Sequence, residues 1–185
     1  GLGKVKKRVE ELVNLQKVNK ARASKGLESL GSGLNLVFLG EPGTGKTTVA
    51  RIVGQIYGSL GLLERGHVVE VGRQDLVASY VGQTAPKVEK VVDSAMGGVL
   101  FIDEAYSLST EGSHANDYGH EAVATLIQLM ENNRDKIAVF VAGYEKQMNS
   151  FLDSNPGLRS RFTNTLTFES YTPEEMVEIA RVMIE

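Results

Sequence analysis

The sequence predicts an α/β fold, a three-layer αβα sandwich around a parallel sheet, and three observations carry that prediction. Short apolar runs alternate along the chain with helical patterns, which is typical of a parallel sheet covered on both faces. A glycine-rich turn at residues 40–45 joins one apolar run to a helical pattern. Another apolar run, 99–102, ends in two adjacent acids. In such sheets the ligand site lies at the carboxyl ends of the strands.

Composition narrows the class of protein. The 185 residues suffice for one domain, or one and a small piece, and 42% are hydrophobic. The formal charge of −3 gives no broad basic face for nucleic acid. No cysteine is present, which excludes disulfides and cysteine zinc sites. No apolar run approaches the ~20 residues of a membrane helix, and we expect no membrane partner and a cytoplasmic location.

Periodicity predicts the elements in order. Residues 4–22 place Val5, Val9, Leu12, Val13 and Gln16 on one helical face, and 24–33 have linker composition. The predicted strands are 36–39, 67–71, 99–102, 137–142 and 164–168. The predicted helices are 46–60, 74–78, 85–96, 119–132 and 147–153, with loops at 80–82 and 107–117. Thr172-Pro173-Glu174-Glu175 reads as a further helix start.

The turn after the first strand predicts a phosphate site. Gly40-Glu41-Pro42-Gly43-Thr44-Gly45-Lys46-Thr47 matches the phosphate-binding loop at every fixed position. Its N–H groups and the start of the next helix face an anion. We assign nucleotide binding to Gly40, Glu41, Pro42, Gly43, Thr44, Gly45, Lys46, Thr47 and Thr48, with Lys46 also catalytic through the β- and γ-phosphates. The alternative is a tight turn from strand to helix with no binding function. It is disfavoured because the strand and the helix that the motif requires are both present.

Asp103 and Glu104 predict the second half of that site. Two adjacent acids after four buried residues must leave the core, and at a strand tip they can. Asp103 would hold Mg²⁺ together with Thr47, and Glu104 would activate water for attack on the γ-phosphate. Two surface acids opening a loop are the alternative. No Asn-Lys-x-Asp follows the loop, which favours ATP over GTP.

Arg159 and Arg161 follow a Pro-Gly turn and are expected to project from a loop edge. We assign them to catalysis as an arginine finger that enters a neighbouring subunit's site. Arg161 is the better candidate because Phe162 can anchor the loop in the core. The alternatives are an ordinary exposed pair, or salt bridges to Glu174 or Glu175.

At this point the chain resembles an AAA+ ATPase over residues 35–180, near the red-type rubisco activases (CbbX) and stage V sporulation protein K. The matching strings follow the motifs above in order. They are Val37–Gly40 running into Pro42–Ala50, Tyr80–Lys87, Gly97–Tyr106, Met130–Asp135 and Ala142–Tyr144. Gly1-Leu2 with Val5-Lys6 resembles the end of the family's adenine-side box, which adds Leu2 to the nucleotide-binding residues.

The resemblance implies a P-loop NTPase sheet of five strands in the order 5-1-4-3-2 and a ring of six subunits. It also implies that Tyr80-Val81-Gly82 is a pore loop that grips a polypeptide. From the residues alone, a core tyrosine on an amphipathic segment is the preferred interpretation of Tyr80.

Two departures from the family follow. Ala142-Gly143-Tyr144 stands where a polar sensor is usual, so Tyr144 or a neighbour would act instead. The lid domain is missing after Glu185, so we expect the large ATPase subdomain of a longer protein. We divide the chain into an N-terminal helix and linker (1–34), an AAA+ ATPase core (35–171) and the start of a truncated lid (172–185).

Three functions remain open. The first is an ATP- and Mg²⁺-dependent ATPase that threads or remodels proteins through a homo-hexameric pore. Rubisco is a candidate client by family likeness, and a sporulation or secretion partner fits as well. The second is a nucleotide-switched assembly scaffold without threading, and the third is a P-loop small-molecule kinase. His114, Asp117 and His120 suggest a metal site only loosely, and we expect solvated side chains.

Overall fold

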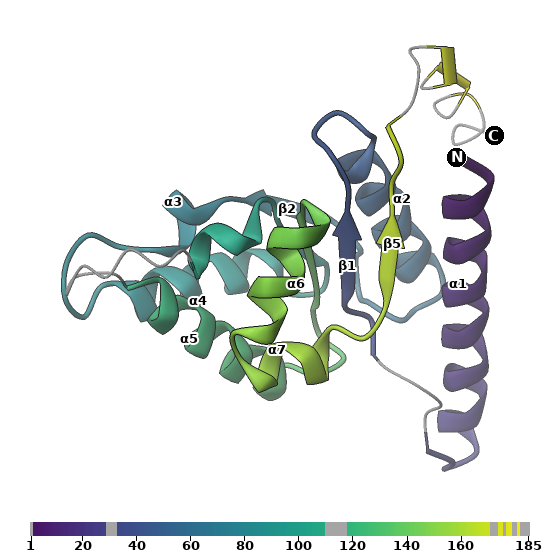
Figure 1. Cartoon of the computed structure of the whole chain (residues 1–185). Helices are drawn as coiled ribbons and strands as arrows, with labels where there is room; N and C mark the ends of the chain where they lie inside the picture. The colour runs from purple at the N-terminus through teal and green to yellow at the C-terminus, as the bar shows by residue number, and fades with distance from the viewer. Residues whose placement is uncertain are drawn as a thin grey trace.

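A computed structural model describes residues 2–28, 33–109 and 118–170, and five positions between 174 and 181. Within that part of the chain, five strands form one sheet in the order β2-β3-β4-β1-β5, and every pairing is parallel (Figure 1). This confirms the predicted order 5-1-4-3-2. The strands are β1 (Leu36–Leu39), β2 (Val68–Val71), β3 (Val99–Ile102), β4 (Ala138–Gly143) and β5 (Thr165–Thr167).

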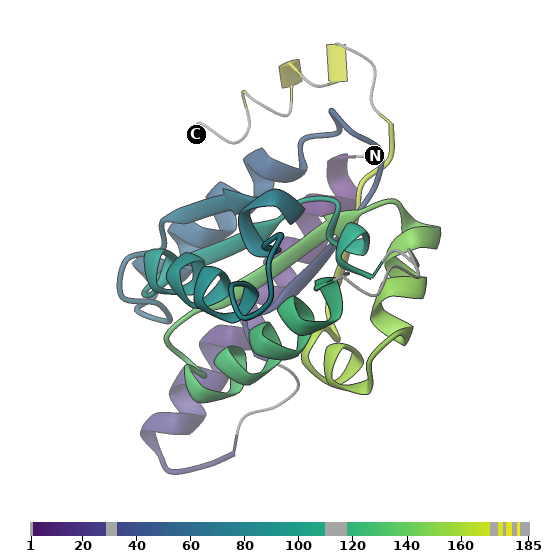
Figure 2. The same cartoon turned by 90° about the vertical axis from the view of Figure 1, so that its left-hand side faces the viewer.

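Helices cover both faces of the sheet. They are α1 (Leu2–Ser24), α2 (Lys46–Ser59), α3 (Arg73–Leu76), α4 (Thr84–Ala95), the 3₁₀ turn η1 (Ala105–Leu108), α5 (Gly119–Asn132), α6 (Glu145–Asp153) and α7 (Pro156–Arg161). In Figure 1, α1 and α2 lie on one side of the sheet and α4 to α7 on the other. Figure 2 shows the teal and green helices in front of the sheet and the purple α1 behind it. The predicted three layers are therefore present.

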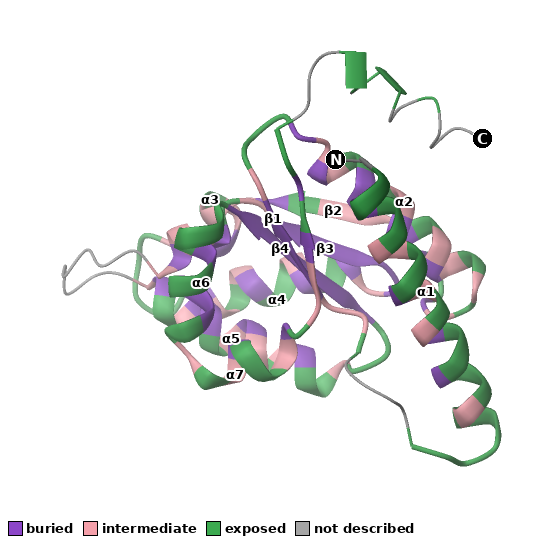
Figure 3. Ribbon diagram, turned by 45° about the vertical axis from the view of Figure 1, so that its right-hand side comes forward, coloured by how far each residue is buried: buried purple, intermediate pink, exposed green. Residues whose placement is uncertain are grey.

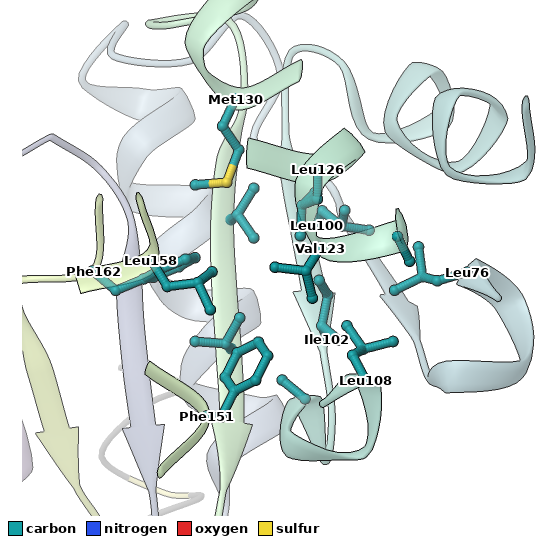
Figure 4. Packing of buried hydrophobic residues seen from close by; sticks show 14 of the residues in the cluster. Leu76, Leu100, Ile102, Leu108, Val123, Leu126, Met130, Phe151, Leu158 and Phe162 are labelled. Atoms are coloured by element: carbon teal, nitrogen blue, oxygen red, sulfur yellow. The ribbon is translucent and has the colours of Figure 1, made fainter. Parts of the chain in front are cut away.

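The central strands are buried because helices pack on both of their faces. Every residue of β1, β3 and β4 is buried. Figure 3 shows these strands in purple between helices that carry buried, intermediate and exposed residues. One core lies between the sheet and the helices from α3 onward, and Figure 4 shows Leu100, Ile102, Leu126, Phe151 and Leu158 within it. Continuous apolar strands are what a doubly covered parallel sheet requires.

An aromatic cluster forms the centre of the other core, beneath α1 and α2. The ring of Phe38 stacks on Phe140 at a centroid distance of 5.3 Å and on Phe168 at 5.6 Å. The edge of a third ring, Phe101, lies at 5.7 Å. Three of these rings lie on β1, β3 and β4 and the fourth directly follows β5, so the cluster ties these four parts of the sheet together.

The N-terminal helix is amphipathic as predicted. Val5, Leu12 and Gln16 are buried, while Val9 and Val13 are half-buried. Lys4 forms an ion pair with Glu169 at 3.5 Å, beyond the end of β5. This helix therefore lies along the outer edge of the same core.

The segment before β5 differs from the prediction. Residues 156–161 form the helix α7 instead of a loop, because the Asn155 side chain caps it by accepting a bond from the Gly157 N–H at 2.8 Å. Pro156 occupies the first helical position, where its missing N–H costs nothing. The turn η1 was likewise not predicted. The helix start predicted at Thr172-Pro173 lies outside the described residues.

Among the described residues, no helix is both long enough and apolar enough to cross a membrane.

Replacing Phe38 with alanine tests the aromatic cluster. Phe38 is fully buried, so we expect Phe38→Ala to lower the free energy of unfolding by about 3–5 kcal/mol. Urea unfolding followed by circular dichroism measures this change. Val81→Ala, at an exposed position, is the control and should change it by less than about 0.5 kcal/mol. Equal losses for both variants would contradict the packing described.

Candidate active site

A cleft of about 470 Å³ opens at the carboxyl edge of the sheet, where three strands deliver loops side by side. The loop after β1, the acids after β3 and the residues at the end of β4 form its walls. It is lined by Pro42, Gly43, Thr44, Gly45, Lys46, Thr47, Thr48, Asp103, Glu104, Gly143 and Tyr144. The structure thus brings the two predicted halves of the nucleotide site into one cleft. The predicted binding residues Gly40 and Glu41 lie just before this lining.

The glycines of the loop are required by its backbone. A Cβ on Gly40 would lie 2.7 Å from the Phe168 carbonyl oxygen, so no larger residue fits between β1 and the chain after β5. Gly45 precedes α2 with φ of 92°, in the left-handed region that glycine adopts most readily. The hydroxyl of Thr44 donates to the Glu41 carbonyl at 2.7 Å and closes the turn. The loop and the first residues of α2 line the cleft, and the N–H groups at a helix start can bind an anion there.

Lys46 is the buried cation of the site. Its ammonium group donates to the Gly40 carbonyl across the loop. Burial lowers the pKa of Lys46, while the charges of Asp103 and Glu104 oppose that shift. A partly desolvated ammonium group next to a glycine cradle gains most from an anionic ligand. The residues present therefore fit a polyphosphate.

Glu104 has an unusual backbone conformation. Its φ of 49° and ψ of 46° lie in the left-handed region, which is uncommon for a residue other than glycine. The turn is stabilised by its own N–H, which donates to the Asp103 carboxylate at 3.0 Å. Strained conformations of this kind cluster at functional sites. Here the residue with this conformation lines the cleft directly after β3.

Glu70 is a neighbour of the site that sequence reasoning missed. The Thr47 hydroxyl lies 3.5 Å from the Glu70 carboxylate on β2, which also meets Arg51 at 4.0 Å. No sequence motif marks Glu70 as part of the site. It comes close to Thr47 through the pairing of β2 with β3, which a short sequence pattern does not encode.

One tyrosine lines the other wall, and a second interacts electrostatically with residues of the site. Tyr144, the predicted sensor, lines the cleft just after β4. Partial burial raises the pKa of Tyr106, and the charges of Glu104, Tyr144 and Asp103 raise it further. Sequence reasoning gave Tyr106 no function, although it follows Asp103-Glu104 closely in the chain. The sensor assignment of Tyr144 stays a prediction.

Arg159 and Arg161 do not line the cleft. They lie on α7, beside the amino end of β5 and at the opposite end of the sheet from the phosphate loop (Figure 1). Arg159 donates to Asp153 at 2.7 Å and Arg161 to Glu131 at 3.0 Å. The segment predicted as a loop edge is therefore a short helix. The two arginines form their ion pairs with Asp153 and Glu131. Phe162 is buried and anchors the segment as expected.

The predicted pore loop lies between α3 and α4. Tyr80 is 77% exposed and Val81 is 81% exposed, so the alternative of a core tyrosine is wrong. Gly82 has a φ of 77° and open space where a Cβ would lie. The loop therefore presents one aromatic and one aliphatic side chain to solvent.

Two further interpretations, the loose metal site and the nucleotide contact of Leu2, can be placed only in part. His120 is exposed on α5, whereas His114 and Asp117 lie outside the described residues. Within the described ranges no cluster of three His, Asp or Glu side chains could hold a metal ion. The side chain of Leu2 is likewise outside the described part, so its contact with a nucleotide stays a prediction.

Removal of the Lys46 ammonium group tests the phosphate cradle. A charge-assisted hydrogen bond contributes about 1.5–3 kcal/mol, so Lys46→Ala should raise the Kd for a fluorescent ATP analogue roughly 10–100-fold. Titration followed by fluorescence anisotropy measures this affinity. Lys7→Ala, at an exposed position of α1, is the matched control and should bind as the unchanged protein does. An unchanged Kd for Lys46→Ala would place the phosphates elsewhere.

Comparison with known proteins gives a consistent picture. The chain is 48% identical over 185 residues to the chloroplastic ribulose bisphosphate carboxylase/oxygenase activase of Cyanidioschyzon merolae, covering all of this chain and 63% of that protein. It is 48% identical over 183 residues to protein CfxQ of Xanthobacter flavus, 99% of this chain and 57% of that protein. It is also 48% identical over 185 residues to the ESX-3 secretion system protein EccA3 of Mycobacterium tuberculosis, all of this chain and 29% of that protein.

These relatives confirm the resemblance to the red-type rubisco activases. The chain spans just under two thirds of the length of the activase it matches. Residues 36–170 match the model of the AAA family, described as the ATPase family associated with various cellular activities. With the phosphate loop, the acidic tip of β3 and this match in agreement, the chain belongs to the AAA family of ATPases.

Proposed function

We propose that the protein containing this chain hydrolyses ATP in the cleft at the end of β1 and β3 and uses that reaction to remodel a protein substrate. The observation that carries the proposal is the convergence of Lys46, Thr47, Asp103 and Glu104 on one cleft. Phosphoryl transfer to water needs a cation for the phosphates, a hydroxyl and an acid for the metal ion, and an acid for the attacking water. A small-molecule kinase is not proposed, because residues 36–170 match the AAA family of ATPases.

Each residue has one task in the proposed reaction. Lys46 and the loop N–H groups bind the β- and γ-phosphates, and Thr47 and Asp103 hold Mg²⁺. Bound there, Mg²⁺ supplies positive charge that neutralises the phosphate oxygens. Glu104 orients a water molecule and accepts its proton as the oxygen attacks the γ-phosphorus. The bond between that phosphorus and the β–γ bridging oxygen breaks, and ADP and inorganic phosphate are the products. Arg161, with Arg159 beside it, comes from a neighbouring subunit and stabilises the charge that develops.

The exposed loop supplies the contact with the substrate. Tyr80 offers a large apolar surface at low entropy cost, and Gly82 lets the loop change its conformation. In a homo-hexameric ring such loops would face a common channel and grip an extended polypeptide. One relative is named as a rubisco activase, so rubisco is a reasonable first client to test. A cytoplasmic location also remains part of the proposal.

A scaffold function is the second candidate. One relative is named for the ESX-3 secretion system, and a role in assembling such a system requires no threading. In that case ATP binding would order a complex and Tyr80 would be dispensable. The two candidates share the cleft and differ in the need for the exposed loop.

The proposed water-activating carboxylate can be tested by Glu104→Gln. The amide keeps the size of the side chain and cannot accept the proton, so kcat should fall roughly 10²–10⁴-fold while ATP still binds. Phosphate release and nucleotide binding, both measured on the full-length protein, separate the two effects. Glu121→Gln on α5 is the control and should hydrolyse normally. Normal hydrolysis by Glu104→Gln would show that the chemistry is assigned wrongly.

Removal of the Tyr80 ring separates threading from scaffolding. Tyr80→Ala should keep basal ATP hydrolysis and lose the stimulation that an unfolded polypeptide such as casein produces, because the aromatic grip is gone. Leu27→Ala, at another exposed apolar position, should retain the stimulation. The readout is the ratio of phosphate release with and without casein. Full stimulation of Tyr80→Ala would favour the scaffold.

A further inference from the structure

Arg161 is held in place by its own chain. Its guanidinium group donates to Glu131 at 3.0 Å through one nitrogen, and through another to the Gly157 carbonyl at 3.2 Å and the Ser160 hydroxyl at 3.3 Å. Glu131 lies near the end of α5, thirty residues earlier in the chain. Its carboxylate also meets Arg134, at the longer distance of 3.6 Å. Arg161 is thus the better-placed partner of that acid.

Such contacts matter because arginine is a flexible side chain. An unheld arginine samples many rotamers, whereas a planar guanidinium group bound on two nitrogens has its orientation fixed. The Arg161 side chain remains 24% exposed, so its charge still reaches the surface of the molecule. A finger that enters another active site must be both oriented and accessible, and this geometry provides both.

The neighbouring arginine is held by different groups. Arg159 donates to Asp153 at 2.7 Å and to the Asn149 carbonyl at 3.2 Å, both on α6. The bond from Arg159 lowers the pKa of Asp153. Because the two arginines depend on separate acids, each can be released from its acid without removing either guanidinium group.

We propose that Glu131 is a positioning residue for ATP hydrolysis in the neighbouring subunit, acting by orienting Arg161. This inference rests on the proposed function, since it requires that Arg161 serve a site other than its own. Glu131 is remote from the phosphate loop and lines no part of the cleft. Its effect should therefore appear in turnover rather than in nucleotide binding.

Glu131→Ala in the full-length protein provides the direct test. A misplacement of about 1 Å costs on the order of 10²-fold in rate, so kcat should fall roughly 10–100-fold with the KM for ATP and the oligomeric state unchanged. Glu131→Gln, which can still accept a hydrogen bond, should retain more activity than Glu131→Ala. Arg134→Ala is the matched control, because it removes the weaker partner of Glu131 and leaves Arg161 bound. It should turn over normally.

Three outcomes of that test would overturn the proposal. An unchanged kcat would show that the contact with Glu131 is not needed. A higher kcat would show that Glu131 holds the arginine back rather than in position. Asp153→Ala, measured beside these variants, releases Arg159 from its acid, and a loss confined to that variant, with Glu131→Ala normal, would make Arg159 the finger.

Mixing two variants gives a readout that a merely structural effect would not change. Subunits with Glu131→Ala keep an intact cleft, and subunits with Glu104→Gln keep an intact arginine. In mixed assemblies the second kind can supply Arg161 to the first, so the mixture should hydrolyse ATP faster than the two variants do separately. Absence of recovery would refute action on a neighbouring site. The proposed chemistry is judged independently, by the activity of Glu104→Gln alone.

Discussion

The parallel register of β1, β4 and β3 is the constraint on which the site depends. Leu39 pairs with Gly143, and Val141 pairs with Ile102, so all three strands end at one edge of the sheet. The Gly40 N–H continues the ladder by donating to the Gly143 carbonyl at 3.1 Å. A slip of this register would carry the phosphate loop away from Asp103 and turn the strand side chains to the wrong faces. Two buried cores, one on each face, hold the register in place.

The rigid core supports a site that is locally unfavourable. Lys46 is buried with a lowered pKa, and Glu104 adopts a left-handed backbone conformation. Burial disfavours the charged form of Lys46, so a negatively charged ligand would compensate that cost, and the backbone of Glu104 lies in a sparsely populated region of the kind found at functional sites. The arginines of α7 lie at the other end of the sheet, held by Glu131 and Asp153. Among the residues that the structure describes, Lys46 is the cation that lines the cleft, and we propose that a second copy of the chain supplies an arginine.

Sequence reasoning recovered what depends on local pattern and motif. The strands and long helices followed from periodicity, and the cleft followed from the phosphate loop and Asp103-Glu104, whereas the strand order came from the family resemblance. The helix α7 was missed because Pro156-Gly157 reads as a turn, while the cap that starts the helix depends on the orientation of Asn155. The partners of the arginines and the approach of Glu70 to Thr47 were also missed. Those contacts join residues far apart in the chain, and no short pattern encodes them.

A crystal structure of the full-length protein with Mg²⁺ and a non-hydrolysable ATP analogue tests the central claim most directly. The account predicts the triphosphate in the cleft between the loop before Lys46 and the tip of β3. It also predicts Mg²⁺ at about 2.1 Å from the Thr47 hydroxyl oxygen. A nucleotide bound at another surface, or a triphosphate in the cleft whose metal contacts neither Thr47 nor the Asp103 side of the site, would contradict it.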